Sequence, residues 1–264
     1  MEEDAKKWLW WGIPIVVAAG LLAALYYGRK HQEEPPAQQQ VSTQPAAPAP
    51  TPPPDNYPIE PGAADAKPLP ALADSDAELH ESLNGVVGRA LDEFLVPKEI
   101  VRHIVVTVDN LTRKKTSVQM RPLKPTGGQL MVSGADQQLT LSPDNFARYE
   151  PLMKVLRNTD TRQVAAVYKR FYPLFQQAYA ELGYPDGYFN NRLVAVIDHL
   201  LETPEVQGPI KLVQPSVFYQ FADPALEERS AGQKLLIRMG PENAATIKIK
   251  LRELRREVAK QAER

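Results

Sequence analysis

The stretch VYKRFYPLFQQAYAELGYPDGYFNNRLVAVIDHLLETPE, residues 167–205, says most about the fold. Apolar residues recur every three or four positions over 164–182 and again over 190–201, as they do on one face of a helix. Between them, residues 184–188 contain the Pro, Asp and Gly that favour a turn. The pattern predicts two amphipathic helices joined by a turn, the first bent at Pro173 and the second central to the core.

Helical spacing also appears on both sides of this pair. Ser75 and Glu78 match a capping box, which predicts a helix from residue 76. Further helices are expected over 97–111, 143–157, from 224, over 234–239 and from 241 to 261. The β-branched run at 104–108 is also compatible with a strand. Short strands are expected at 129–132, 137–141, 210–213 and 217–221. The fold class is therefore mainly α with a minor antiparallel β component.

The last helix carries an apolar seam and a basic surface. Its seam residues repeat at intervals of four, three and four, which suits packing on the core or a coiled coil with another chain. They are Ile247, Leu251, Leu254 and Val258. The surrounding Lys and Arg residues indicate a solvated helix face, or alternatively a contact with an acidic partner or anionic lipid.

Residues 8–27, WLWWGIPIVVAAGLLAALYY, contain no charged side chain. About 20 apolar residues cross the hydrocarbon of a bilayer as a helix. Aromatic residues at both ends resemble interfacial belts, and the following sequence lacks a clear cleavage site. We expect a single uncleaved transmembrane helix after a short tail, 1–7. Basic residues flank the span almost equally, and we favour a cytoplasmic N-terminus.

Residues 28–71 form a linker rich in Pro, Ala and Gln. Twelve of the 39 residues from 32 to 70 are proline. Such a composition buries too little apolar surface to fold, so we expect a disordered spacer with extended polyproline character. An α-rich globular domain, 72–264, is expected after it.

Three stretches carry a resemblance to a known family. They are RHIVVTVDNL at 102–111, the segment 167–205, and LLIRMGPENA at 235–244. They are similar to the uncharacterised proteobacterial family named domain of unknown function 3014, over residues 72–260. The resemblance implies the same order of parts, namely a membrane anchor, a Pro-rich linker and this domain. The family has no assigned activity, so the resemblance supplies no catalytic residue.

The residues themselves give little sign of catalysis. The chain has no cysteine and a formal net charge of −1, which excludes thiolate chemistry and gives no basic footprint for nucleic acid. No zincin, P-loop, dinucleotide or serine-elbow motif is present, so we expect no metal and no cofactor. His199, with Asp198 and Glu202, is the nearest approach to a site, and a polar edge of a core helix explains it better.

The turn between the two central helices is the better candidate for binding. Aromatic residues mixed with Asp and Asn in a loop are typical of contact surfaces. The candidate binding residues are Tyr184, Asp186, Tyr188, Asn190 and Asn191. The plainer alternative is an ordinary turn, with Asn190 or Asn191 capping the next helix.

Together these patterns predict a single-pass protein of the bacterial inner membrane with a periplasmic, non-enzymatic binding domain. The bilayer would contact residues 8–27, and the partner would be another envelope protein or cell-wall material. One alternative is an enzyme acting on envelope polymer through Asp198, His199 or Asp186. Another is the reverse orientation, with the domain in the cytoplasm.

Overall fold

The computed structural model describes residues 57–59, 68–117, 119–135 and 138–260, all within the compact unit Pro53–Arg264. The expected anchor at 8–27 and most of the expected linker lie outside these residues. Within the described part, every helix is too short or too polar to cross a bilayer.

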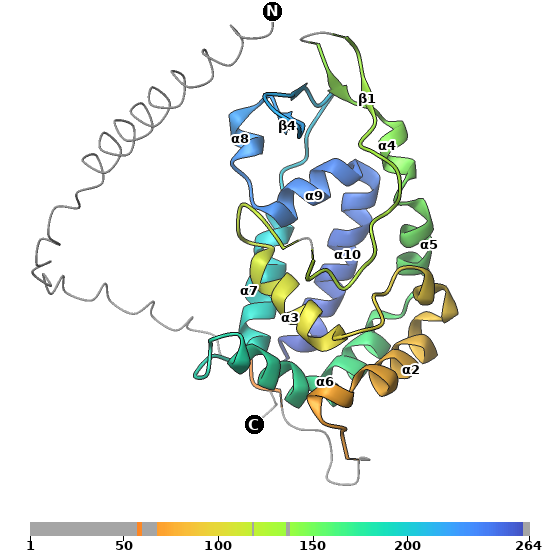
Figure 1. Cartoon of the computed structure of the whole chain (residues 1–264), viewed down its shortest axis with the longest axis vertical. Coiled ribbons are helices and arrows are strands. Elements are labelled where there is room, and N and C mark those ends of the chain that lie inside the picture. Colours follow the sequence, from red (N-terminus) through yellow and green to blue (C-terminus); the bar gives the residue numbers. More distant parts are fainter. Residues whose placement is uncertain (1–56, 60–67, 118, 136–137, 261–264) are drawn as a thin grey trace, which may run out of the picture. The chain divides into compact units, whose positions relative to one another are not determined.

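The described residues form a mainly helical domain with small antiparallel sheets, which confirms the predicted fold class (Figure 1). Short 3₁₀ helices η1 (Leu72–Asp74) and η2 (Arg89–Glu93) flank the first described α-helix. The α-helices are α2 (Asp76–Val87), α3 (Ile100–Asn110), α4 (Asp144–Ala147), α5 (Glu150–Asn158), α6 (Thr161–Glu181), α7 (Phe189–Leu201), α8 (Pro224–Glu227), α9 (Ala231–Met239) and α10 (Pro241–Val258).

The two helices of the quoted stretch, α6 and α7, are the centre of the packing. Both contact α3 on one side and α10 on another, and α2 packs on α6. The main core cluster contains Phe171 and Phe175 of α6 and Phe189 of α7, all nearly inaccessible to solvent. Helix α6 continues through Pro173 to Glu181. The apolar spacing of the sequence therefore identifies the faces that form the core.

The seam of α10 packs inward. Val258 and the partly buried Leu251 and Leu254 join Val194 and Ile197 of α7 in one cluster. Ile247 packs against a neighbouring cluster formed by α7 and α9. The first interpretation of the seam, packing on the core, is confirmed.

The capping box expected at Ser75 is wrong. The Ser75 hydroxyl donates to the carbonyl of Leu72 over 2.8 Å, and no side chain caps α2. The neighbouring Asp76 acts instead on α3: its carboxylate accepts from the backbone N–H groups of Glu99 and Ile100, at 2.7 and 2.9 Å. A carboxylate suits these orphan donors, which the helix cannot satisfy itself. Helix α3 is thus capped by a residue of α2.

The single helix expected over 143–157 is wrong as well, because the chain forms α4 and α5 with a break between them. Pro151 lies in the first turn of α5. A proline inside a continuous helix would lack an N–H and would collide with the carbonyl four residues earlier, here Ala147. The break after Ala147 places Pro151 where its missing donor costs nothing.

The strands form two hairpins. Strand β1 (Val132–Ser133) pairs with β2 (Thr140–Leu141), and β3 (Leu212–Val213) pairs with β4 (Gln220–Phe221), both antiparallel. An isolated antiparallel bridge between Thr140 and Lys211 joins the hairpins. Each strand is shorter than expected. In particular, Val217 and Phe218 do not pair as part of β4 but lie in the loop before it.

Candidate binding site

Gln176 of α6 fixes the loop between α6 and α7 by hydrogen bonds to its backbone. The Gln176 amide donates to the carbonyl of Gly187 over 2.7 Å, and its oxygen accepts from the backbone N–H of Phe189 over 2.9 Å. Tyr172 donates to the same oxygen, so the amide is locked by three hydrogen bonds. A rigid loop fixes the start of α7, which carries the two asparagines of the predicted site.

The structure separates the five predicted binding residues rather than gathering them into one surface. Asp186 and Tyr188 are exposed on the loop, whereas Tyr184 is half-buried. Asn190 is fully inaccessible to solvent, and Asn191 is partly buried beside it. A binding role for Asp186 and Tyr188 stays a prediction.

Asn190 and Asn191 grip a segment of the chain that lies far away in the sequence. The Asn191 side-chain oxygen accepts from the backbone N–H of Tyr57 over 2.8 Å. The Asn190 amide donates to the carbonyl of Tyr57 and to that of Val258, both over 2.8 Å. Both backbone groups of Tyr57 are thus satisfied by side chains of α7. We call this arrangement the asparagine clamp. Neither asparagine caps α7 through its side chain, because the N-cap is Tyr188.

Aromatic side chains hold the clamp in place. The Tyr168 hydroxyl donates to the Asn190 side-chain oxygen over 3.1 Å. Its ring packs against Phe175 and Phe189, which stack on each other with centroids 5.7 Å apart. Burial raises the pKa of Tyr168, so the phenol remains a neutral donor. With this bond, every donor and one acceptor site of the Asn190 amide is used.

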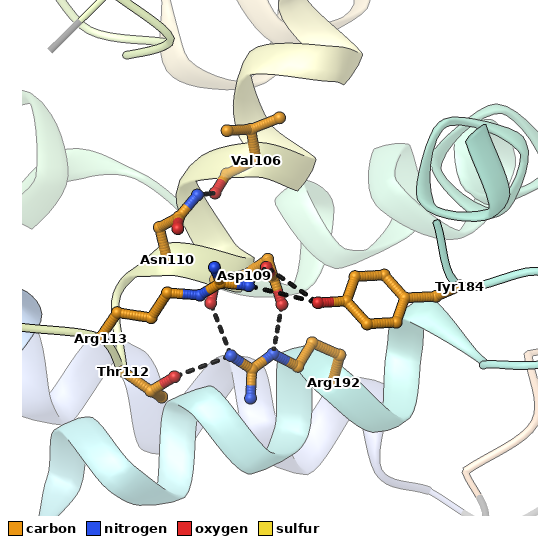
Figure 2. A network of polar contacts seen from close by, with 7 residues as sticks. All are labelled: Val106, Asp109, Asn110, Thr112, Arg113, Tyr184 and Arg192. Atoms are coloured by element: carbon orange, nitrogen blue, oxygen red, sulfur yellow. Dashed lines mark hydrogen bonds and ion pairs between the residues drawn. The ribbon is translucent and has the colours of Figure 1, made fainter. Parts of the chain in front are cut away.

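A polar network next to the clamp ties α7 to the end of α3 (Figure 2). The buried carboxylate of Asp109 accepts from Nε of Arg192 over 3.1 Å and from Arg113 over 2.6 Å. Arg192 also donates to the Asp109 carbonyl over 2.5 Å and to the Thr112 hydroxyl over 2.7 Å. The Tyr184 hydroxyl lies 3.4 Å from the same carboxylate. Asp109 therefore has three neighbours that compensate its burial.

Tyr184 belongs to this network rather than to a free surface. Its ring stacks on Tyr179, with centroids 4.6 Å apart. Burial raises the pKa of Tyr179, and the nearby Asp109 carboxylate adds to the effect. The neighbouring Asn110 donates to the carbonyl of Val106 over 2.7 Å, a local bond within the last turn of α3.

The region that contains the two asparagines of the clamp and the Asp109 network also carries the family relationship. The family model DUF3014, described as a protein of unknown function, matches residues 100–255, more than half of the chain. The chain belongs to the DUF3014 family. No curated protein and no solved structure matches this chain. The matched DUF3014 region begins at α3 and includes Asn190, Asn191 and the Asp109 network, but not Tyr57.

Two of the alternative candidates for chemistry, Asp198 and His199, have structural partners in the DUF3014 domain. Asp198 receives two hydrogen bonds from Arg255, at 2.5 and 2.9 Å. A ring nitrogen of His199 lies 2.8 Å from the hydroxyl of Ser230, which caps α9 by accepting from Gln233. Among the described residues, no group of three or more His, Asp or Glu could hold a metal ion.

Three basic residues near the C-terminus, Lys250, Arg255 and Lys260, pair with acids. A hollow of about 490 Å³ lies between the start of α6 and the end of α10, lined by cations and carboxylates alike. Lys250 pairs with Glu253 over 3.5 Å and Lys260 with Glu257 over 2.9 Å. Lys248 is buried and donates to the carbonyl of Thr203 over 2.6 Å. These pairs favour the solvated-face interpretation of the helix.

The most exposed apolar side chains of the described DUF3014 domain lie on the β3–β4 hairpin. Val217 and Phe218 in its loop are 80% and 77% exposed, and Val213 on β3 is 42% exposed. The base of the hairpin is buried: Leu212 and Phe221 belong to a core cluster with Ile237. The hairpin thus holds two large apolar side chains out in solvent on a packed support.

Sequence reasoning missed Tyr57 as a member of the site. The signal was present, because Val41, Tyr57, Ile59 and Leu69 are the large apolar residues between 32 and 70. Tyr57, Ile59 and Leu69 all pack on core clusters. Isolated apolar residues in a polar, proline-rich segment thus mark points of contact with the domain.

Proposed function

We propose that this protein is a single-pass protein of the bacterial inner membrane that presents an α-rich, non-enzymatic binding domain in the periplasm. The apolar run at 8–27 would be the anchor and the Pro-rich segment 28–71 the spacer. The partner would be another envelope protein, which contacts the β3–β4 hairpin. Membership of the DUF3014 family is consistent with this order of parts but assigns no activity.

The observation that carries the proposal is the exposed hairpin loop. Val217 and Phe218 are adjacent and together expose one apolar patch, and contiguous apolar patches on a polar surface mark contact sites. Phenylalanine is enriched at protein interfaces, where its removal from water supplies binding free energy. A polar cell-wall polymer would gain less from these side chains, so we favour a protein partner.

The position of the hairpin supports the proposal. The hairpin packs on the end of α9, where the Arg238 guanidinium lies 5.0 Å from the Phe221 ring, and α10 begins directly after α9. The asparagine clamp instead contacts Val258 at the other end of α10. The 18 residues of α10 span about 27 Å. The chain therefore enters the domain far from the apolar loop, which leaves that loop accessible while the spacer is attached.

Membrane orientation can be tested with enzyme fusions. Alkaline phosphatase, which is active only in an oxidising compartment, is fused to the C-terminus of the full chain. We expect an active phosphatase fusion and an inactive fusion to a cytoplasmic reporter. The opposite pair of results would place the domain in the cytoplasm and refute the periplasmic part.

The contact surface can be tested by photo-crosslinking in cells. A photoreactive amino acid replaces Phe218 in one strain and Ile249 in a control strain, since Ile249 is also exposed, at 53%. We expect one defined protein to be crosslinked from position 218, and to be lost when Val217→Ser is added. The same products from both positions, or a product insensitive to Val217→Ser, would contradict the proposed surface.

A further inference from the structure

The asparagine clamp has the features of a peptide-binding site. In recognition of extended peptides, hydrogen bonds to the main chain supply affinity, and pockets for alternate side chains supply specificity. Here Asn190 and Asn191 bind the carbonyl and the N–H of one residue, Tyr57. These bonds read the backbone, so they would accept any non-proline residue at that position.

Specificity comes from the residues on either side of Pro58. Pro58 is exposed, whereas Tyr57 packs on the cluster of Val194 and Val258, and Ile59 packs on the main core cluster. Residues at positions i and i+2 of an extended segment point to the same side. The proline also restricts the preceding tyrosine to extended conformations. The surface that residues 57–59 cover, which we call the groove, therefore selects an aromatic residue followed, two positions later, by an aliphatic one.

Arg255 adds a polar contact for the aromatic residue. Two hydrogen bonds from Arg255 to Asp198 fix its guanidinium, and these bonds are the main reason that its pKa is raised. The Tyr57 hydroxyl is a further interaction partner that raises the pKa of Arg255. A tyrosine fits this environment better than phenylalanine would. Asp198 positions Arg255 here.

The groove and its occupant differ in their relation to the family. Asn190, Asn191 and Arg255 all lie in the matched region 100–255, as does Tyr168 behind them. The occupant, residues 57–59, lies outside it. Apart from Val258, the residues named here that contact Tyr57 lie in the family region, and the segment seated on them comes from outside it.

We propose that this groove is a peptide-binding site, that residues 57–59 occupy it as a built-in ligand, and that a partner protein displaces them. The partner's ligand is an extended segment with tyrosine two positions before an aliphatic residue. The proposal does not rest on the proposed function, since it involves neither the β3–β4 hairpin nor the side of the membrane on which the domain lies.

The direct test uses the full chain in detergent micelles and a fluorescent peptide with the sequence of residues 55–61, DNYPIEP. The double variant Tyr57→Gly, Ile59→Gly removes the built-in side chains, and circular dichroism checks its helix content. The apparent affinity measured by anisotropy equals the intrinsic affinity multiplied by the fraction of sites that is unoccupied. If residues 57–59 fill the site in at least about nine molecules of ten, binding to this variant should be at least about tenfold tighter. A control peptide with glycine in place of Tyr and Ile should not bind.

A matched variant tests whether the clamp itself makes the contact. Asn191→Ala, added to the double variant, removes the acceptor for the peptide N–H and should weaken binding several-fold. Equal affinities for the peptide and its glycine control would overturn the proposal, and so would full affinity in the Asn191→Ala variant. In either case residues 57–59 are only part of the folded core.

A second measurement avoids the double variant if it folds poorly. The chain has no cysteine, so Pro58→Cys, at an exposed position, can carry a single spin label. Excess unlabelled DNYPIEP should convert the immobile spectrum to a mobile one, and the glycine control should not. An unchanged spectrum at saturating peptide would overturn displacement. A dimer that requires Tyr57 and excludes the peptide would assign the groove to a second copy, and would overturn the partner proposal.

Discussion

The two arginines that bind Asp109 should differ strongly in their contribution to stability. Arg192 makes three hydrogen bonds, to the carboxylate and carbonyl of Asp109 and to the Thr112 hydroxyl, and its side chain is 26% exposed. Arg113 also binds the carboxylate, but its side chain is 55% exposed. The substitutions compared are Arg192→Met and Arg113→Met, which keep most of the aliphatic stem.

The expected cost follows from burial. Hydrogen bonds to charged groups are worth about 1.5–3 kcal/mol each, but three bonds of one side chain are not additive. Removing one partner of a buried pair costs about 3–5 kcal/mol. Asp109 keeps Arg113 and Tyr184, and Arg192 is partly hydrated, so we expect about 2–4 kcal/mol for Arg192→Met. For the exposed Arg113 we expect less than about 1 kcal/mol.

The assay is urea unfolding of the full chain in detergent micelles, followed by far-ultraviolet circular dichroism. Tryptophan fluorescence would not report on the domain, because the three tryptophans are Trp8, Trp10 and Trp11. Helix content reports directly on α3 and α7, which the network joins. If Arg113→Met cost as much as Arg192→Met, burial would not explain the strength of the network.

Two further predictions concern packing and acid stability. Gly232→Ala should destabilise the domain by about 1–3 kcal/mol, because the added Cβ would lie 2.6 Å from the Leu200 side chain. Gly85→Ala in α2 should instead stabilise the domain by about 0.5–1 kcal/mol, because its Cβ would meet no atom within 4 Å. Equal effects in thermal unfolding would contradict this contrast. A hydrogen bond from Thr161 is the main cause that lowers the pKa of Glu253, so Thr161→Ala should raise that pKa in a carboxyl NMR titration. The pKa of Glu253 is lower in the folded state than in the unfolded state, so the bond stabilises the domain at pH values above the unfolded-state pKa. This stabilisation is lost as the pH falls through the folded-state pKa. An unmoved titration of Glu253 would show that Thr161 does not act on it.

The regular spacing of apolar residues was sufficient to predict the helices that bury one face. The stripes over 164–182 and 190–201 correspond to α6 and α7, and the seam of the last helix packs inward as one of two expected arrangements. These elements are predictable because the spacing of apolar residues within one helix determines which face is buried. The break between α4 and α5 was also readable, since Pro151 forbids a continuous helix there.

The binding site could be predicted only in part. Asn190 and Asn191 were among the expected residues, but their partner Tyr57 lies more than 130 positions away. Hydrogen bonds between distant residues leave no periodic trace in a sequence. The same reason hides the Asp76 cap on α3 and the pairing of Asp109 with Arg192. Side-chain amides and carboxylates could be recognised as candidates, whereas their partners required the fold.

The asparagine clamp also sets an order of events during synthesis. Asn190 joins Tyr57 to Val258, the last residue of α10, and these two residues are separated by 201 positions. At about 5–20 residues per second, a ribosome needs roughly 10–40 s to make the chain between them. The segment at Tyr57 therefore emerges long before its complete binding site exists. The docking of this segment is therefore the step that must wait for helix α10.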